Sequence, residues 1–343
     1  MGVNLKELII RKDIAIEDLS GKSFAVDGHN ALYQFLSTIR QPDGSPLTDK
    51  KGRITSHLNG LFNRSSYLMR QDIKLAFVFD GKVPDLKAKE IARRKEIKVE
   101  AQEKFEQAKK AQNIDEMKKY AARTTRLTKE MIDQAKQLLD LMGIPVVQAA
   151  SEGEAQAAYM AKQGDVYAAV SQDYDTLLYE TPRLIQNLSV SAKRKLPGKL
   201  GYQPVSPQMI TLKDALKELG LSQDQLIALA MLVGTDYNPG GIKGIGPKKA
   251  LALVKKHPGD IKDIFEEANW SEHIDVPWKD IYAMFTSMPV SKDYELKWSK
   301  PKIDKLNSFL VEDFGFSQER IAASLEKLEE HAKQRQQRSL GDF

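Results

Sequence analysis

Six acidic residues stand where short apolar runs of the chain end. They are Asp27, Asp80, Glu152, Glu154, Asp173 and Asp175. Asp27, for example, directly follows the run Phe24–Val26, and Asp80 follows Phe77–Phe79. If these runs are parallel strands of one open sheet, their carboxyl ends share one edge, which is where such sheets bind ligands. We therefore expect the six acids to converge on one crevice.

Carboxylates that crowd together need cations. Like charges a few ångströms apart raise one another's pKa until protons or cations neutralise them. The chain has no Cys, and we expect none of its five His beside these acids. A hard cation, Mg²⁺ or Mn²⁺, is the counter-ion that suits such oxygen ligands. Two such ions about 3.5–4 Å apart form the arrangement that hydrolyses phosphodiesters, so the acids predict this chemistry.

Each acid also has a local structural interpretation. The sequence Ser151-Glu152-Gly153-Glu154 fits a helix capping box, with Ser151 as the N-cap and Glu154 at N3. Asp27 and Asp80 each precede a Gly, as turn residues often do. The recurrence of acids at four successive strand ends favours the catalytic interpretation.

The sequence Asp173-Tyr174-Asp175-Thr176 allows a second class of enzyme. Phosphatases of the haloacid-dehalogenase type use an Asp-x-Asp-x-Thr loop whose first Asp is a covalent nucleophile. That loop normally begins the catalytic domain, whereas here it closes a series of acids. An aspartate-nucleophile phosphatase, with Asp173 as nucleophile, is therefore an alternative. A branched-DNA-binding scaffold without catalytic activity is a third possibility.

A glycine-rich turn occupies residues 240–249. It is not a Walker loop, because Pro247 stands where Lys is required. It is not a dinucleotide fingerprint either, because it follows a helical pattern rather than a strand. A turn between two helices that exposes the N–H groups of Gly244 and Gly246 suits a DNA phosphate, with Lys248 and Lys249 in the next helical turn. A plain interhelical turn is the alternative.

The positive charge of the chain is concentrated in one window. Residues 82–129 contain 15 Lys or Arg and 8 Asp or Glu, whereas the whole chain has a net charge of +5. Such a window is typical of a surface that meets phosphates, although a solvated charged helix gives the same pattern. Lys87 and Arg94 are two helical turns apart on one helix face, which begins shortly after Asp80. There they could steady the scissile phosphate, although their spacing alone favours two charges that face the solvent.

The elements that must position these residues follow an alternating pattern. The expected strands are Ser23–Val26, Leu75–Phe79, Ile144–Val147 and Val166–Val170. Helix-like stretches separate them, which predicts an α/β fold with a mostly parallel central sheet flanked by helices. No Gly or Pro occurs between Asp85 and Met142, so we expect helix throughout, in two or three pieces. The basic, turn-rich residues 193–201 predict a loop or hairpin, and the C-terminal third is helical by pattern.

The composition is that of an ordinary globular protein, with 41% hydrophobic and 29% charged residues among 343. No apolar run approaches the roughly 20 residues that span a bilayer, and residues 1–4 lack the layout of a secretory signal. We expect no membrane association and a cytoplasmic location.

Taken together, the motifs resemble those of the flap endonucleases, structure-specific 5′ nucleases, and the short C-terminus resembles archaeal members. The matching motifs are Val26–Gly28, Val78–Lys82, Ser151–Ala155, Asp173–Asp175, Gly234–Tyr237 and Gly244–Lys248. The resemblance covers nearly the whole chain. It implies a PIN-like 5′ nuclease core with a helical arch and a helix–two-turn–helix DNA-binding element.

The resemblance also implies roles for single residues. It adds Asp236 to the metal-binding acids and matches Lys87 and Arg94 to the catalytic basic pair of the family. Tyr33 matches the aromatic residue that stacks at the cleavage junction, and Gly2 matches an N-terminal glycine buried near the active site. The full set of expected DNA-binding residues is Gly2, Tyr33, Arg40, Arg64, Gly244, Gly246, Lys248 and Lys249.

The implied domain organisation is one 5′ nuclease domain over residues 1–335, followed by a tail. Within the domain we expect an N-terminal nuclease region at 1–100, an arch insertion at 82–136, an internal nuclease region at 140–257 and the helix–two-turn–helix at 234–256. In the tail, residues 336–343, Gln337, Leu340 and Phe343 resemble a sliding-clamp-binding motif. The second aromatic residue of that motif is absent, because the sequence stops at Phe343.

The implied function is hydrolysis of a phosphodiester at the base of a 5′ flap, together with 5′–3′ exonuclease activity. Two Mg²⁺ ions, which Mn²⁺ can replace, are the expected cofactors. The expected partners are branched DNA and a sliding clamp, with the chain working as a monomer in DNA replication, including Okazaki fragment maturation, and in DNA repair.

Overall fold

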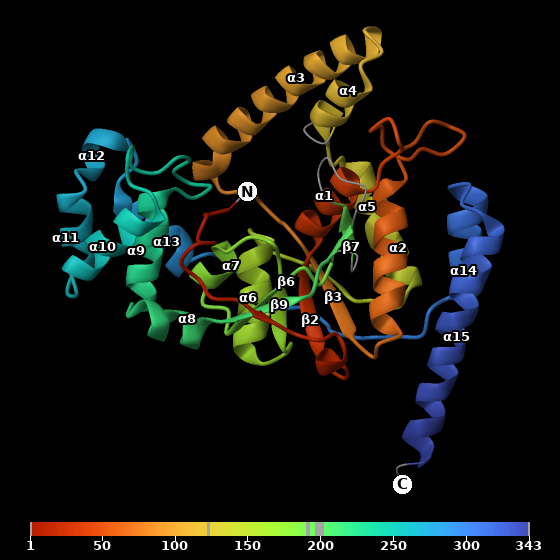
Figure 1. Cartoon of the computed structure of the whole chain (residues 1–343). Coiled ribbons are helices and arrows are strands. Elements are labelled where there is room, and N and C mark those ends of the chain that lie inside the picture. Colours follow the sequence, from red (N-terminus) through yellow and green to blue (C-terminus); the bar gives the residue numbers. More distant parts are fainter. Residues whose placement is uncertain (1, 122–123, 190–192, 196–201, 342–343) are drawn as a thin grey trace.

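A seven-stranded sheet lies at the centre of the computed structural model, which describes residues 2–121, 124–189, 193–195 and 202–341 (Figure 1). In spatial order the strands are β1 (Lys12–Asp13), β9 (Gln208–Thr211), β6 (Arg183–Gln186), β5 (Ala168–Val170), β2 (Ser23–Asp27), β3 (Lys74–Phe79) and β4 (Val146–Gln148). The five strands from β6 to β4 are parallel, whereas β9 is antiparallel to β6 and β1 to β9. The mostly parallel sheet predicted from the sequence is confirmed, but β1, β6 and β9 were not predicted.

The two faces of the sheet carry side chains of different size. In β3, Leu75, Phe77 and Phe79 face one side and Ala76 and Val78 face the other, as the two-residue period of a strand requires. The face with the large residues packs against α1 (Gly28–Thr38), α2 (Ser56–Met69), α5 (Lys129–Leu141), α14 (Ile303–Asn307) and α15 (Gln318–Gly341). A short π-helix, Ser308–Asp313, joins the last two of these helices.

The face with the small residues is covered by α6 (Gly153–Gln163) and by an extended segment, residues 289–302, that runs beneath the sheet (Figure 1). In this segment the Trp298 indole N–H donates to the Leu75 carbonyl at 2.6 Å, and Tyr294 and Leu296 pack on the sheet. The segment therefore fastens the C-terminal helices to the sheet.

A helical subdomain packs beside the sheet and has its own apolar cluster. It consists of α7 (Asp175–Leu178), α8 (Leu212–Leu219), α9 (Gln223–Val233), α10 (Pro247–Lys256), α11 (Ile261–Glu267), α12 (Trp270–His273) and α13 (Trp278–Thr286). The N-terminal residues Val3, Leu5 and Ile9 are buried in the same cluster. Folding of this subdomain thus fixes the start of the chain.

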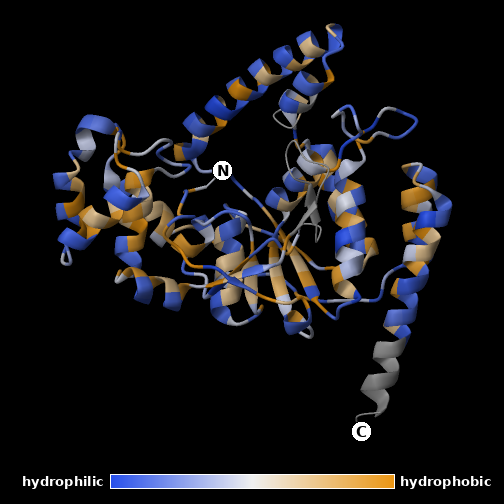
Figure 2. Cartoon of the chain, in the orientation of Figure 1, coloured by the Kyte–Doolittle hydropathy of each residue, from blue (hydrophilic) through white to orange (hydrophobic). Residues whose placement is uncertain are grey.

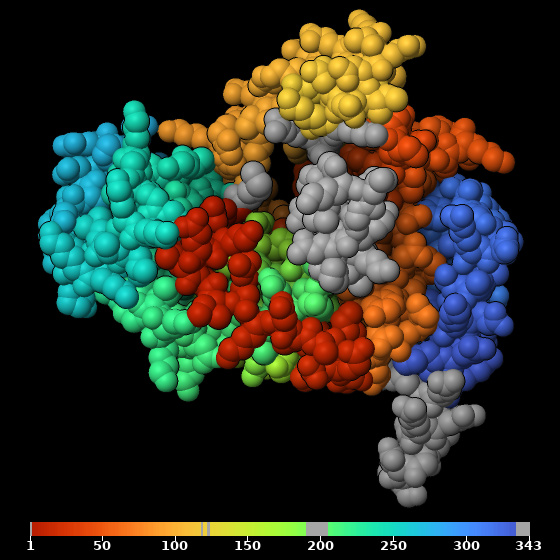
Figure 3. Space-filling model, in the orientation of Figure 1, coloured from red at the N-terminus to blue at the C-terminus, as the bar shows by residue number. Residues whose placement is uncertain are grey.

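The segment that lacks Gly and Pro is helical in pieces, as predicted. A 3₁₀ turn (Asp85–Lys87) leads into α3 (Ala88–Lys110), which pairs with α4 (Ile114–Ala121). These two helices form an arch that stands above the body, and the surface beneath α3 is hollowed (Figure 3). Figure 2 shows that α3 is hydrophilic along most of its length, unlike the helices that cover the sheet.

The basic stretch near residue 200 contains the predicted hairpin. Strands β7 (Lys193–Lys195) and β8 (Tyr202–Pro204) pair antiparallel, and the residues between them lie outside the described part of the chain. Among the described residues, no helix is both long and apolar enough to cross a membrane.

Two loops cross at the carboxyl edge of the sheet. The Gly81 N–H donates to the Ser151 carbonyl at 2.7 Å, and the Lys82 N–H donates to the Ala150 carbonyl at 3.1 Å. A Cβ atom at Gly81 would lie 2.1 Å from the Ala149 carbonyl oxygen, which is backbone and cannot move aside. Glycine at this position allows the loop that carries Asp80 to contact the loop that carries Glu152.

We expect Gly81→Ala to lower the free energy of unfolding by about 1–3 kcal/mol, because the added methyl group must force the two loops apart. Chemical denaturation would measure the loss. Gly259→Ala is the matched control, since a Cβ atom there meets no atom within 4 Å. Equal stability of the two variants would show that the loops tolerate separation.

Candidate active site

The carboxyl edge of the sheet gathers seven acidic residues. Asp27 ends β2, Asp80 follows β3, Glu152 and Glu154 begin α6, Asp173 and Asp175 follow β5, and Asp236 follows α9. Each of the seven interacts electrostatically with at least one of the others. The structure therefore brings together all the acids named from the sequence, including Asp236, which strand-end reasoning had missed because it follows a helix.

Burial and mutual repulsion disfavour the charged forms of these acids. Burial first, and the Asp80 carboxylate second, raise the pKa of Asp27 to about 8. Burial and Asp173 raise the pKa of Asp175 to about 7. Burial and Asp175 also raise the pKa of Glu154 well above its usual range. The charged forms of these three carboxylates are therefore costly unless further cations compensate them.

Two side chains from the arch supply part of the missing positive charge. Lys87 Nζ lies 2.6 Å from Glu152 Oε2 and 3.2 Å from Asp236 Oδ2. Arg94 forms an ion pair with the same Asp236 through Nη2. Burial opposes the charged form of Lys87, but Glu152 and Asp236 outweigh it and raise its pKa. The predicted basic pair thus lies among the acids, on the first turns of the arch.

Backbone and amide donors hold the other acids in place. The Val3 N–H donates to Asp175 Oδ1 at 2.7 Å, and the Gly2 N–H donates to Asp173 Oδ1 at 3.2 Å. Asn30 Nδ2 donates to Asp173 Oδ2 at 3.0 Å. A Cβ atom at Gly2 would lie 2.5 Å from Asp175 Oδ2, so the start of the chain reaches the site only as glycine.

A tight turn after α9 places Asp236. Thr235 Oγ1 donates to Asn238 Oδ1 at 2.6 Å, and Asn238 Nδ2 donates to the Met231 carbonyl at 2.6 Å. The neighbouring Tyr237 hydroxyl lies 3.1 Å from that of Tyr179. The turn is therefore closed by its own side chains, and Asp236 is left facing Lys87.

The carboxylates lie close together, but they do not converge on one point. In the described part of the chain, no three or more Asp, Glu or His side chains are already arranged to hold one metal ion. Mutual repulsion keeps such charges apart, and Lys87 and Arg94 engage two of the seven. The donor set nevertheless fits a hard divalent cation, because it consists of carboxylate oxygens and its seven acids outnumber the two cationic side chains among them.

A histidine lies beside the acids, contrary to expectation. His29 Nδ1 is 3.2 Å from Asp80 Oδ2 and accepts from the Asp80 N–H, also at 3.2 Å. Its ring also meets Phe79 edge-on. His29 is only two residues beyond Asp27, so its spacing was a usable signal. Its contact with Asp80 arises because β2 and β3 are adjacent strands.

The capping box predicted at Ser151 is wrong. Glu152, not Ser151, is the N-cap of α6, and the first helical N–H groups are capped from another strand: the Gly153 N–H donates to Asp80 Oδ1 at 2.7 Å. The Ser151 hydroxyl donates to the Lys82 carbonyl instead. Glu154 accepts from the hydroxyl of Ser171, a contact that the sequence did not indicate.

Tyr33 lies under the arch. Its side chain is partly exposed, and Lys98 Nζ from α3 lies 4.9 Å from its ring centroid and 3.2 Å from its hydroxyl. The arch and α1, which carries Tyr33, therefore meet at this ring.

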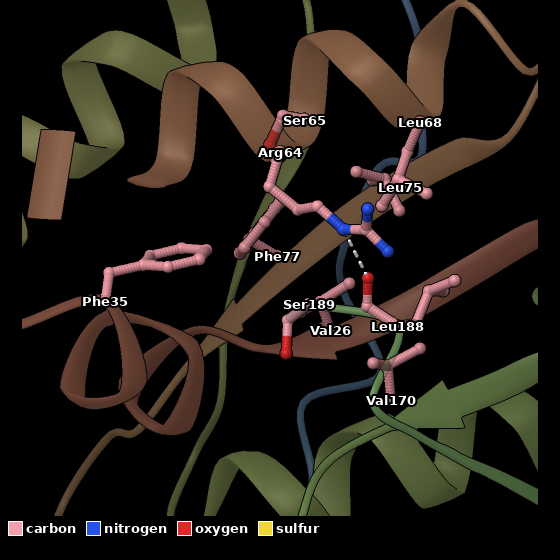
Figure 4. Close-up of a pocket in the computed structure, with 10 residues that line it drawn as sticks. All are labelled: Val26, Phe35, Arg64, Ser65, Leu68, Leu75, Phe77, Val170, Leu188 and Ser189. Carbon is pink, nitrogen blue, oxygen red and sulfur yellow. Dashed lines mark hydrogen bonds between the residues drawn. The ribbon is translucent and has the colours of Figure 1, made fainter. Parts of the chain in front are cut away.

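The two arginines expected to contact DNA donate to the protein itself. Arg40 donates to the carbonyls of Ser37 and Gly44 and to the hydroxyl of Thr125. Arg64 lies in a small, largely apolar pocket between α2 and the sheet, where Nε donates to the Leu188 carbonyl at 2.7 Å (Figure 4). Burial lowers the pKa of Arg64 to about 10.

The glycine-rich turn joins α9 to α10, as predicted, and its glycines serve two purposes. Gly241, with φ of 58°, packs against the Leu232 carbonyl, which leaves no room for a side chain. Gly244 adopts φ of 83° in open space, and nothing lies near Gly246, the N-cap of α10. The turn is thus fixed at one end and accessible at the other, where exposed Lys248 stands.

The predicted clamp-binding residues cannot be placed. Gln337 and Leu340 fall within the backbone of α15, but their side chains lie outside the described part of the structure, as does the whole of Phe343.

Comparison with known proteins identifies the family. Family models described as XPG N-terminal domain and XPG I-region match residues 1–101 and 143–236. Flap endonuclease 1 from Thermococcus onnurineus is 51% identical over 343 residues, covering 99% of this chain and 98% of its own length. The chain belongs to the flap endonuclease family. Family members are structure-specific 5′ nucleases, so the chain is an enzyme that hydrolyses phosphodiester bonds in flapped DNA. A role in DNA replication and repair fits this family.

Solved structures agree with this assignment. Flap endonuclease-1 from Methanococcus jannaschii superposes with a TM-score of 0.77 at 42% identity, covering 97% of this chain and all of that one. The catalytic core of Rad2 in complex with DNA substrate has a TM-score of 0.67 at 26% identity, with coverage of 93% and 96%. The flap endonuclease assignment replaces both alternatives, the phosphatase with an Asp173 nucleophile and the scaffold without activity.

The crowding of the acids makes a prediction about stability. In chelator at neutral pH, Glu154→Gln should unfold at a temperature roughly 2 °C or more above the wild type, because it removes a carboxylate that on folding must either take up a proton or stay charged against burial and Asp175. The amide oxygen can still accept from Ser171, and differential scanning fluorimetry measures the change.

Added Mg²⁺ should raise the melting temperature of the wild type more than that of Glu154→Gln, since a ligand stabilises the state that binds it. Glu103→Gln, at an exposed position of α3, is the control and should behave as the wild type. A lower melting temperature for Glu154→Gln in chelator would mean that the Glu154 carboxylate is stabilising, against the electrostatic account.

Proposed function

We propose that the seven acids hold two divalent cations, Mg²⁺ with Mn²⁺ as a substitute, and that this centre cuts the phosphodiester at the base of a 5′ flap. The observation that carries the proposal is the clustering of buried carboxylates whose pKa values are raised by burial and by one another. When bound, such cations lower the pKa of a coordinated water and stabilise the charge that builds on the phosphate. The expected products are a 5′-phosphate and a nicked duplex.

In this proposal Lys87 and Arg94 change partners: they pair with carboxylates in the absence of DNA and with the scissile phosphate in its presence. In the absence of DNA they pair with Glu152 and Asp236. When cations take over these carboxylates, the same ammonium and guanidinium groups become free to donate to the scissile phosphate. Fixed donors at the place where charge develops are among the strongest contributors to catalysis, and both side chains project from the arch directly over the acids.

We propose the remaining DNA contacts from the positions of the residues in the fold. Tyr33 lies on α1, the helix whose N-cap is Asp27, and its exposed ring can stack on a base at the cleavage junction. The open turn at Gly244–Lys249 presents backbone N–H groups and two lysines to a phosphate of the duplex. Arg40 and Arg64 must exchange their present carbonyl partners for phosphates to contribute.

We further propose the domain organisation and partners expected from the sequence. One nuclease domain over residues 1–335 contains the arch and the helix–two-turn–helix, and the tail at 336–343 binds a sliding clamp. The chain works as a monomer in the cytoplasm. The packing that joins α15 and the extended segment to the sheet supports a single domain.

We expect Asp175→Ala to slow cleavage of a labelled 5′-flap duplex by roughly 10²–10³-fold, while most of the affinity for the flap is kept. The reason is that Asp175 is buried in the acid cluster and does not reach the DNA-facing turn. A gel-based cleavage assay with and without chelator, paired with fluorescence anisotropy, measures both quantities. Cleavage at the wild-type rate, or full activity in chelator, would contradict the metal assignment.

A double variant, Lys248→Ala with Lys249→Ala, should weaken flap binding and make it less dependent on salt. The slope of the logarithm of the binding constant against the logarithm of salt concentration should fall by about one for each phosphate that the variant no longer neutralises. Lys300→Ala is the control: Lys300 is exposed beyond Trp298, at the opposite edge of the sheet from the acids. An unchanged slope in the double variant would remove the turn from the DNA interface.

A further inference from the structure

One of the few buried residues of the arch is charged. Of the 23 residues of α3, only Glu90, Ala101 and Ala108 are buried. The side chain of Glu90 is 3% exposed, although isoleucines on the same helix, such as Ile91, remain about half exposed. Burying a carboxylate is costly unless donors compensate it, so the position of Glu90 requires an explanation.

The compensation comes from two arginines on the next helical turn. Glu90 Oε1 accepts from Arg94 Nε at 2.6 Å and from Arg93 Nη2 at 2.8 Å, and Oε2 accepts from Arg93 Nε at 2.7 Å. Burial alone would raise the pKa of Glu90, but these donors outweigh it and keep the pKa below its ordinary value. Glu90 is therefore a charged and well-bonded carboxylate at the base of the arch.

Arg94 is held between two carboxylates. Its Nε donates to Glu90, and its Nη2 donates to Asp236 in the acid cluster. The guanidinium group is a rigid, planar fork, so a bond at Nε sets the direction of the two terminal nitrogens. With Nε fixed by Glu90, Nη2 faces the acid cluster, where it contacts Asp236.

We propose that Glu90 is a positioning residue that holds Arg94 in its working orientation. A cation held by Asp236 would take the place of Arg94 at that carboxylate, whereas the hydrogen bond between Arg94 and Glu90 lies within one helix and would remain. Arg94 then presents its terminal nitrogens to the phosphate without having to order a free side chain. This inference rests on the proposed role of Arg94 at the scissile phosphate.

A simpler role for Glu90 would be to stabilise α3 through the pairs with Arg93 and Arg94, which have helical i,i+3 and i,i+4 spacing. The two roles differ in how the effect depends on Arg94. A helix-stabilising pair affects the arch as a whole, including its grip on DNA. A positioning residue affects the chemical step, and only while Arg94 is present.

The test compares Glu90→Gln with Glu103→Gln, which makes the same change at an exposed position of the same helix. Single-turnover cleavage of a 5′-flap duplex in Mg²⁺ gives the rate of the bound complex, and fluorescence anisotropy gives the affinity. We expect Glu90→Gln to lower the rate roughly tenfold, with affinity within about twofold. Glu103→Gln should match the wild type in both.

A double-mutant cycle decides between the two roles. In an Arg94→Ala background, Glu90→Gln should have no further effect on the rate. An equal loss of rate in both backgrounds, or a loss confined to affinity, would overturn the positioning role in favour of helix stabilisation. A normal rate for Glu90→Gln would overturn it as well.

The outcomes separate this inference from the proposed function. If Arg94→Ala itself cleaves at the wild-type rate, the proposed role of Arg94 fails. If Arg94→Ala is slow but Glu90→Gln is normal, only the positioning role fails. Should Glu90→Gln unfold, Glu90→Asp keeps the charge but shortens the reach to Arg94 Nε, and it should also be slow. A normal rate for Glu90→Asp would then count against the positioning role.

Discussion

The repulsion among buried carboxylates is the constraint around which the rest of the molecule is arranged. Asp27 and Asp175 are buried and Glu154 is half-buried, and burial and neighbouring charges shift their pKa values upward. Such a cluster of acids does not stabilise a protein fold, so we explain its presence by the cations that it binds. Lys87 and Arg94 relieve part of the repulsion, and both come from the arch. The base of the arch is thus held by ion pairs to carboxylates that a divalent cation would also bind. Cation binding and the release of Lys87 and Arg94 are therefore linked.

The fold solves a second problem, which is to hold mutually repelling groups in one place. Neutral donors do much of this: the N–H groups of Gly2 and Val3 and the amide of Asn30 bind Asp173 and Asp175 without adding charge. Val3 is itself fixed by apolar packing, since its side chain belongs to the cluster that organises the helical subdomain. The site is therefore shared between sheet and helical subdomain, and neither could form it alone.

The sequence was most informative where one local pattern decides the structure. Short apolar runs located β2 and β3, and the acids at their ends lie where strand ends should lie. Strands β1, β6 and β9 were missed because none of them has more than two apolar residues in succession. Contacts between segments far apart in the sequence could not be predicted. Ser151, for example, has the sequence position of a helix cap, yet Asp80 caps α6, because β3 ends beside the start of that helix. The contact of His29 with Asp80 depends in the same way on which strands are neighbours. Asp236 came only from family resemblance, since its turn follows a helix.

The central claim is that divalent cations complete the acid cluster and release Lys87 and Arg94. A crystal structure with Mn²⁺ and a flap duplex, with anomalous scattering used to locate the metal, tests this most directly. The account predicts two anomalous peaks about 3.5–4 Å apart among the seven carboxylates, with Lys87 and Arg94 turned from Glu152 and Asp236 toward the phosphate. Peaks elsewhere on the molecule, or a metal-filled site in which both cationic side chains keep their present carboxylate partners, would contradict it.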